Sequence, residues 1–545
     1  MSAAGHVRVA SVASERAAVR ARPPLPGWWP LMALTLLAAA LRLSTLDLQS
    51  FWYDEAFTPV HVLHASLWAT LRSVVHSENT PPLWYVIAWA DARVLGTGEI
   101  ALRLPSALAG IATVPVAWAI GRELATRRAA IVCAALVAVN PLFVWYSQEA
   151  RAYGLFVLTG ALAILCFLRA LRDPSPRRMA LFALAGALAL ITHYFAVFLL
   201  IGMALVLVWD RHTRRAALPA LGVLVLVGAA LLPLISAQGG HGTQWIGQWP
   251  LSQRLEAIPQ YYLTGYSGAP LGRGIELLVA LPIIAGLALG LRRMRERPPT
   301  APAAGGAPLA SAAHGDGNPE HPRDRGRGVL IALAIAACGV LIPIALIAFG
   351  ADYLAPRNLV AAMIPLTAVI AAVTVWPGAG GRRSATAGIA LAATIALAFL
   401  AISIDVDLSP RLQRGNWRDV AKALRAGPRA RAITTVELGS APLEYYLPDL
   451  RGLHEGSSVL VSEIDETGYA PLRASAGQQP APGFHLRARL DVDGLIVYRF
   501  VSPIPRMVSE ATLRRHVITL ASPHVLVVAG ARVAASAAVP TVGNH

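Results

Sequence analysis

The fold of this chain is decided by the stretch WWPLMALTLLAAALRLSTL (Trp28–Leu46), which is followed closely by LQSFWYDEAFTP (Leu48–Pro59). The first segment is long and apolar enough to cross a membrane as a helix. The second places two adjacent carboxylates, Asp54 and Glu55, among aromatic residues at the membrane's edge. Carboxylates are costly in that position. The pair is therefore either an idle, solvated part of a juxtamembrane helix or part of a functional site.

The composition predicts a polytopic membrane protein. Of 545 residues, 55% are hydrophobic and only 14% are charged, and repeated runs of roughly 17–25 apolar residues indicate transmembrane helices. The net charge of +16 comes from short basic clusters between apolar runs. Such clusters are typical of cytoplasmic loops facing anionic lipid, so no nucleic-acid partner is expected. Cys133, Cys166 and Cys338 lie within apolar runs and show neither a disulfide nor a metal-ligand spacing.

The positions of the basic clusters predict the topology. Residues 1–27 are basic and precede an apolar run without a cleavage site, so we expect a cytoplasmic N-terminal segment and a retained first span. The cluster GRELATRR (Gly121–Arg128) should also be cytoplasmic. The segment Pro81–Leu95 is too short and too charged to cross. We therefore expect it to lie on the outer surface, with the second span at Ile100–Ile120.

About nine further spans follow, which makes about eleven, and their connecting loops alternate between the two sides. The third span covers about Ala129–Trp145. The predicted interior loops contain Arg169–Arg178, Asp210–Arg215, Leu291–Arg297 and Gly381–Arg383. The predicted exterior ends lie at Ser147–Tyr153, His193 and Tyr194, the loop after Ser236, Ala351–Asn358 and Asp405.

Two regions outside the spans have distinct compositions. Residues 298–328 are rich in Pro, Gly and Ala and predict a disordered cytoplasmic linker within the membrane domain, residues 28–404. Residues 405–545 predict a small extracytoplasmic α/β C-terminal domain and tail. NWRDVAKALRAG indicates an amphipathic helix, and ARAITTVEL, SSVLVSE and FHLRARLDVDGLIVYRF indicate strands. Beyond Pro503 the sequence allows either a further strand pair or a poorly ordered tail.

Under this topology, four polar clusters share the outer face. They are Asp54 and Glu55; Glu149, Arg151 and Tyr153; His193 and Tyr194; and Tyr353, Arg357 and Asn358. Each cluster alone could be an interfacial anchor or a helix cap. Together they suit chemistry on a lipid-linked phosphate, because arginines bind phosphate with paired hydrogen bonds and a carboxylate can accept a proton from a hydroxyl. Transporters instead place ionisable residues near the midplane.

Six segments carry a resemblance to a known family. They are WYDEAF (Trp52–Phe57), NTPPLWY (Asn79–Tyr85), ALRLPSALAG (Ala101–Gly110), NPLFVWYSQEARAYGL (Asn140–Leu155), THYFAVFLL (Thr192–Leu200) and APRNLV (Ala355–Val360). In this order the chain resembles the GT-C class of polytopic glycosyltransferases, in the branch of protein O-mannosyltransferases, lipid A aminoarabinose transferase and related bacterial enzymes. The resemblance covers roughly residues 28–374.

The resemblance implies roles for particular residues. Asp54 matches the catalytic carboxylate, Glu149 a second acid that positions the acceptor or the base, and Arg357 the arginine that binds the donor phosphate. Residues expected near donor or acceptor are Glu55, Arg151, Tyr153, His193, Tyr194 and Tyr353. One departure is that Asn79 and Thr80 replace the usual histidine before the double proline, which puts any substrate or metal contact of that histidine in doubt.

The resemblance also implies the activity. We expect an inverting transfer of a sugar from a polyprenyl-phosphate carrier to a lipid, glycan or protein acceptor on the extracytoplasmic face of the cell (plasma or inner) membrane. No cofactor is implied with confidence, and a role for a divalent ion stays open. The alternative is a polytopic lipid or polysaccharide transporter without transferase chemistry.

Overall fold

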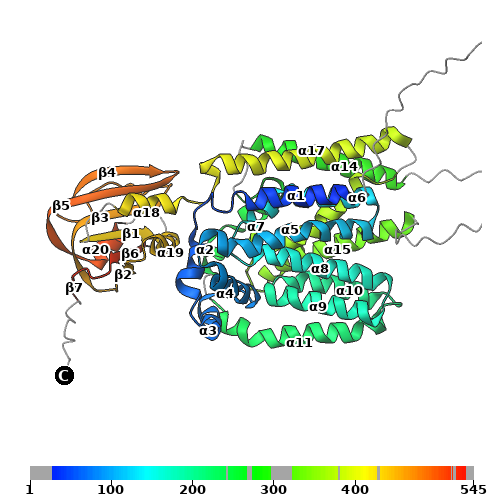
Figure 1. The fold of residues 1–545 in the computed structure, drawn as a ribbon, viewed down its shortest axis with the longest axis horizontal. Helices are drawn as coiled ribbons and strands as arrows, with labels where there is room; N and C mark the ends of the chain where they lie inside the picture. Colours follow the sequence, from blue (N-terminus) through cyan, green and yellow to red (C-terminus); the bar gives the residue numbers. More distant parts are fainter. Residues whose placement is uncertain are drawn as a thin grey trace, which may run out of the picture.

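The computed structural model describes residues 28–240, 243–266, 273–295, 322–377, 381–425, 430–516, 518–519 and 523–534. These residues form a bundle of long helices and a smaller α/β domain beyond one end of it (Figure 1). The predicted N-terminal segment, residues 1–27, lies outside the described residues.

The bundle is built from helices rich in alanine and leucine, both strong helix formers. Its members are α1 (Trp29–Leu43), α5 (Glu99–Leu124), α6 (Arg127–Val139), α7 (Pro141–Ser147), α8 (Tyr153–Arg172), α9 (Pro176–Thr192), α10 (Ala196–Trp209), α11 (Arg214–Gln238), α14 (Arg273–Arg295), α15 (Pro322–Ile347), α16 (Met363–Thr374) and α17 (Gly381–Leu408). Asn140 separates α6 from α7: its side-chain oxygen accepts hydrogen bonds from the backbone N–H groups of Leu142 and Phe143, while Pro141 occupies the first turn of α7.

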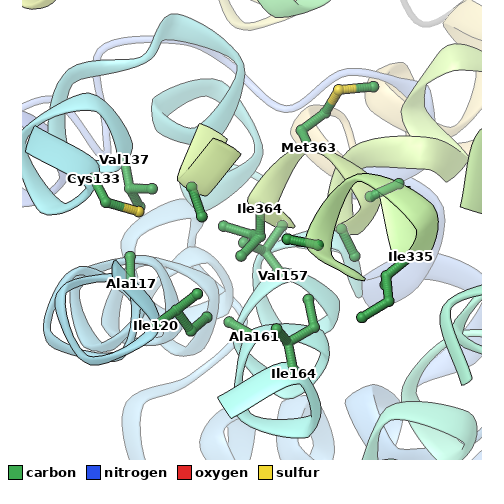
Figure 2. Close-up of a cluster of buried hydrophobic side chains, with 14 of the residues drawn as sticks. Ala117, Ile120, Cys133, Val137, Val157, Ala161, Ile164, Ile335, Met363 and Ile364 are labelled. Atoms are coloured by element: carbon green, nitrogen blue, oxygen red, sulfur yellow. The ribbon is translucent and has the colours of Figure 1, made fainter. Parts of the chain in front are cut away.

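The centre of the bundle is α16, which α5, α6, α8 and α15 contact. In the segment Pro356–Thr374, 83% of an apolar stretch of 18 residues is buried, whereas only 17% of such a stretch is buried in α11 at the periphery. Figure 2 shows Ile364 of α16 among Val157 and Ala161 of α8, with Ile120 of α5 nearby. Small residues allow this close approach: a Cβ added at Gly160 would lie 3.2 Å from the Cβ of Ala361.

Seven helices in the described part of the chain are long and apolar enough to cross a membrane. They are Glu99–Leu124, Tyr153–Arg172, Arg214–Gln238, Gly274–Arg295, Arg325–Ile347, Pro356–Thr374 and Thr386–Leu408. The pair α6 and α7, bent by 55°, makes an eighth if it counts as one span, and α1 and α10 are shorter apolar helices. Helices therefore occupy the predicted positions, but a total of eleven crossings stays a prediction.

The helix α15 begins at Pro322, within the stretch that the sequence analysis assigned to a disordered linker. The linker prediction is thus too long at this end, because residues 322–328 form the first turns of α15. Arg327 in these turns donates a hydrogen bond of 2.6 Å to Asp210, which fixes the start of the helix to the loop after α10. Residues 298–321 lie outside the described residues.

Short helical elements cover the end of the bundle that faces the C-terminal domain. They include α2 (Tyr53–Phe57), the π-helical turn η1 (Thr58–Val62), α3 (Leu67–Ser77) and α4 (Leu83–Leu95) (Figure 1). Also short are α12 (Gln244–Gln248), α13 (Leu251–Thr264) and the 3-10 turns η2 (Pro356–Ala362) and η3 (Pro410–Leu412). The segment Pro81–Leu95, expected not to cross, is thus largely the 13-residue helix α4.

The C-terminal domain is a mixed sheet with three helices. Its strands are β1 (Arg431–Val436), β2 (Leu450–Gly452), β3 (Ser458–Tyr469), β4 (His485–Val492), β5 (Leu495–Ser509), β6 (Pro523–Val528) and β7 (Val533–Ala534). Their order is β2-β6-β1-β3-β5-β4, with β7 beside β3, and among these described strands only the β1–β3 pairing is parallel. The helices are α18 (Trp417–Arg425), α19 (Glu437–Tyr446) and α20 (Glu510–Arg515).

The C-terminal elements follow the predicted pattern closely. The amphipathic segment forms α18, and the longest predicted strand folds into the β4–β5 hairpin. Its turn residues Asp493 and Gly494 both have positive φ, 53° and 94°, as the Asp-Gly signal requires. Beyond Pro503 the chain completes β5 and then forms α20, β6 and β7, so the described part of this region is ordered structure.

Candidate active site

The centre of the site is an ion pair between two residues that are 303 positions apart. Arg357 Nη1 donates a hydrogen bond of 2.7 Å to Asp54 Oδ2. Asp54 lies on α2 and Arg357 on η2, and their side chains are 17% and 20% exposed. The fold therefore brings together the expected base and the expected phosphate-binding arginine in a partly exposed position.

The neighbouring carboxylate, Glu55, is sealed inside the protein. Arg103 of α5 donates to both of its oxygens at 2.7 Å, and the backbone N–H of Ala150 donates at 2.9 Å. Burial would raise the pKa of Glu55, but the charges of Arg103 and Arg414 and these hydrogen bonds lower it overall. Because both oxygens are engaged, we revise its assignment from a substrate contact to a residue that holds the acidic loop.

Glu149 lies in the turn between α7 and α8 and is completely buried. Its Oε2 accepts a hydrogen bond of 3.3 Å from Arg414, whereas its Oε1 has no hydrogen-bond partner among the described residues. Burial raises the pKa of Glu149 to about 7, although Arg414 opposes this shift. One oxygen is thus held by the protein and the other is left for a ligand.

Arg151 is engaged by a carboxylate that the sequence analysis did not single out. Its Nη1 and Nη2 donate to Glu78 at 3.1 and 2.9 Å, and Nη1 also reaches the Asp54 carbonyl at 3.4 Å. Glu78 is nearly buried and directly precedes Asn79 and Thr80, where the chain departs from the family pattern. Since Glu78 takes up this edge of the guanidinium, we reassign Arg151 from binding the donor phosphate to fixing the backbone of α2.

The histidine cluster also differs from its expected role. His193 is buried, with its ring 4.5 Å from that of Phe156 at an angle of 12°, and its Nδ1 accepts from the Phe195 N–H at 3.3 Å. Burial, with the charges of Arg357 and Arg151, lowers the pKa of His193 to about 3. The imidazole is therefore neutral at physiological pH and does not bind a phosphate as a cation.

The three expected tyrosines have different environments. The ring of Tyr153 is buried, and the Arg357 guanidinium lies 5.9 Å from its centre. The Tyr194 hydroxyl donates to Gln238 Oε1 at 2.7 Å, and Gln238 Nε2 donates to two backbone carbonyls near α3. Tyr353 is 50% exposed. Only Tyr153 thus contacts the central ion pair directly, while Tyr194 braces α11 and Tyr353 lies at the surface.

Sequence reasoning missed four residues that shape this site. Arg103, Glu78 and Arg414 supply the counter-charges described above, and Trp245 lies with its ring centre 5.0 Å from the Arg357 guanidinium. Arg103 could have been found, because a charge within the apolar segment ALRLPSALAG needs a partner. Among the residues that the structure describes, no three His, Cys, Asp or Glu side chains cluster as metal ligands, and a divalent ion stays an open question.

Comparison with known proteins gives an independent view of this site. The model of a family described as dolichyl-phosphate-mannose-protein mannosyltransferase matches residues 79–236, which is less than a third of the chain. The comparison with curated proteins found no match.

Three solved structures are among those to which this chain is similar. ArnT from Cupriavidus metallidurans, bound to undecaprenyl phosphate, is 12% identical with a TM-score of 0.49, over 87% of this chain and 98% of that one. The oligosaccharyltransferase from Archaeoglobus fulgidus is 14% identical with a TM-score of 0.45, over 77% and 59%. The arabinosyltransferase EmbB from Mycobacterium smegmatis is 15% identical with a TM-score of 0.40, over 87% and 49%.

The family match confirms the resemblance inferred from the sequence and the glycosyltransferase class that it implied. It gives no support to the transporter alternative. The matched range contains Glu149, Arg151 and His193, whereas Asp54, Glu78 and Arg357 lie outside it.

Proposed function

We propose that this protein transfers a sugar from a polyprenyl-phosphate carrier to an acceptor hydroxyl at the extracytoplasmic face of the cell membrane, with inversion at the anomeric carbon. The observation that carries the proposal is the Asp54–Arg357 pair, which joins a carboxylate and a guanidinium at 2.7 Å in a partly exposed position. One member suits a general base and the other suits a phosphate ligand.

The reaction can be written in terms of these two side chains. As the acceptor oxygen attacks the anomeric carbon, its proton passes to the Asp54 carboxylate, and the bond between that carbon and the phosphate oxygen breaks. The carrier then leaves as polyprenyl phosphate, whose new negative charge Arg357 stabilises. A guanidinium has five N–H donors, so Arg357 can bind phosphate through groups other than the Nη1 that faces Asp54.

The neighbouring residues hold this pair in place. Glu55 binds Arg103 and so joins α2 to α5. Arg151, which is held by Glu78, donates a hydrogen bond to the Asp54 carbonyl of α2. Glu149 presents its unpartnered oxygen to the acceptor. Neutral His193 packs against Phe156.

We place the protein in the cell (plasma or inner) membrane with eleven crossings. In this arrangement residues 1–27 are cytoplasmic, residues 28–404 form the membrane domain, and the C-terminal domain, residues 405–545, lies on the extracytoplasmic side with the site. Cysteines introduced at Gly98 and Ser457, in a background without the three native cysteines, should both react with an impermeant thiol reagent in intact cells. Reaction at position 98 only after permeabilisation would reverse the placement of α4 and of the site.

The direct test of the activity uses purified protein and a lipid-linked sugar with a radiolabelled polyprenyl phosphate. We expect release of free polyprenyl phosphate that depends on an acceptor extract from cell envelopes and that the Asp54→Asn variant does not support. A protein that binds the labelled donor but releases no polyprenyl phosphate with any envelope fraction would contradict the proposed transfer.

A further inference from the structure

The segment that begins the C-terminal domain, residues 414–417, is hydrogen-bonded to Gln49 and Ser50, which shortly precede α2. The Arg414 backbone N–H donates to Gln49 Oε1 at 3.0 Å, and the Trp417 N–H donates to Ser50 Oγ at 3.0 Å. Ser50 Oγ in turn donates to the Gly415 carbonyl at 2.8 Å. Residues 414–417 are therefore held close to the segment WYDEAF (Trp52–Phe57), although Arg414 and Gln49 are 365 positions apart in sequence.

From this anchored backbone the Arg414 side chain enters the protein interior. Its guanidinium lies 4.1 Å from the centre of the Trp145 ring, and its side chain is 2% exposed. Its Nη2 donates to Glu149 Oε2 and to the Trp145 carbonyl, both at 3.3 Å, and its Nε lies 3.8 Å from Glu55 Oε2. A cation buried so deeply must be compensated, and the two carboxylates provide that compensation.

We propose that Arg414 is a positioning residue of the active site, which binds one oxygen of Glu149 and leaves the other free for the acceptor. The inference rests on the proposed function, since it gives Glu149 a task in acceptor binding. It means that the C-terminal domain contributes a side chain to the site and is needed for catalysis.

The electrostatic argument follows from the surroundings of Glu149. Burial raises its pKa, Arg414 and Arg357 lower it, and the neighbouring carboxylates of Glu55 and Asp54 raise it, which together give a pKa of about 7. The phenols of Tyr146, Tyr153 and Tyr266 also lie near this carboxylate. Arg414 makes the hydrogen bond to Glu149, and an opposite charge at such a distance shifts a carboxyl pKa by about 1–3 units. Without Arg414, Glu149 would thus be protonated at neutral pH.

The test compares the pH dependence of turnover in a set of variants of the full-length protein in nanodiscs. Arg414→Ala should move the acidic limb of the profile to higher pH by about 1–3 units, so that activity lost at pH 7 is partly recovered near pH 9. Arg414→Lys keeps the positive charge but loses the paired N–H donors and the planar stacking of the guanidinium. We expect the acidic limb of its pH profile to lie close to that of the wild type. In a Glu149→Gln background, Arg414→Ala should produce no shift.

Two control variants separate positioning from domain attachment. Arg411→Ala changes an exposed arginine three residues earlier and should leave the profile unchanged. Arg418→Ala removes the ion pair with Glu99 that also ties the C-terminal domain to the bundle, and should lower activity at every pH without moving the limb. A uniform loss in Arg414→Ala, like that of Arg418→Ala, would reduce Arg414 to a structural contact and overturn the proposal.

A measurement without turnover keeps this inference separate from the proposed function. Infrared difference spectra of wild type against Glu149→Gln report the protonated carboxyl of Glu149 directly as the pH is varied. Its titration should move upward by about 1–3 units in Arg414→Ala, even if the protein transfers no sugar. An unchanged titration would remove Arg414 from control of Glu149, whatever the activity assay shows.

Discussion

Asp54 and Glu55 are neighbours in sequence, yet each forms its ion pair in a different region of the molecule. Glu55 and Arg103 are 0% and 1% exposed, and two hydrogen bonds of 2.7 Å connect them. Asp54 and Arg357 are 17% and 20% exposed and share one hydrogen bond. A carboxylate–arginine pair is thus used twice. The Glu55–Arg103 pair is fully buried and structural (the sealed pair), whereas the Asp54–Arg357 pair is partly exposed and forms the candidate site (the open pair).

The difference follows from the geometry of α2. Consecutive side chains on a helix point in directions about 100° apart, so Glu55 faces α5 while Asp54 faces the outer loops. The sealed pair joins α2 to a helix of the bundle. The open pair joins α2 to η2, more than three hundred residues later. We therefore expect the first pair to govern stability and the second to govern chemistry, and the variants below test this division.

The largest effect is expected for Asp54→Asn. Asparagine keeps the size of aspartate but cannot accept the proton, and general-base catalysis contributes roughly 10²–10⁴-fold. We expect turnover to fall at least about a hundredfold, while the thermal unfolding midpoint changes less than it does when the fully buried pair is broken, because this pair is partly exposed. The rate of polyprenyl phosphate release checks this. Near-normal turnover here, together with abolished turnover in Glu149→Gln, would show that the base is misassigned.

The sealed pair should give the opposite result. Arg103→Met leaves the Glu55 carboxylate buried without its partner, which costs about 3–5 kcal/mol in comparable cases. We expect a lower unfolding midpoint and a lower yield of folded protein, measured in detergent beside wild type. Glu55→Gln, which can still accept hydrogen bonds from Arg103, should be milder and should lose less turnover than Asp54→Asn. Wild-type stability of Arg103→Met would remove the distinction between the two pairs.

The sequence was most informative where local chemistry determines the structure. The apolar runs and the amphipathic segment of α18 each predicted an element now seen, and the predicted topology placed Asp54 and Arg357 on the same face. Partners could not be predicted in the same way. Glu78 and Arg414 are found only once the helices are packed. Arg103 lies in an apolar segment, which signals that a partner exists but not which carboxylate it is. The neutral state of His193 likewise depends on burial against Phe156.

An intermediate effect is expected for Arg357→Lys, which tests the phosphate role of the open pair. Lysine keeps the charge but cannot reproduce the planar fork of a guanidinium. Loss of one hydrogen bond to a charged group costs about 1.5–3 kcal/mol, so the dissociation constant of the donor should rise roughly tenfold or more. Equilibrium binding of labelled donor measures it, with Arg72→Lys on the exposed side of α3 as the matched control. Equal donor affinity in both variants would take Arg357 out of the phosphate site.

The smallest effect concerns His193, which lies behind the open pair and adds a pH dependence to stability rather than to chemistry. Its pKa is about 3 in the folded protein and about 6.5 in an unfolded chain. Between these values the unfolded state binds the extra proton, so the contribution is fully present above pH 6.5 and is lost as the pH falls toward 3. From pH 8 to pH 5.5 this amounts to about 1.4 kcal/mol.

His193→Asn keeps an acceptor for the Phe195 N–H but cannot titrate in this range. The difference in unfolding free energy between pH 8 and pH 5.5 should therefore be smaller in the variant by that amount. An equal pH dependence in both proteins would mean that the pKa of His193 is not lowered in the folded state. The imidazole would then be charged below about pH 6.5 and would regain its place as a phosphate ligand beside Arg357.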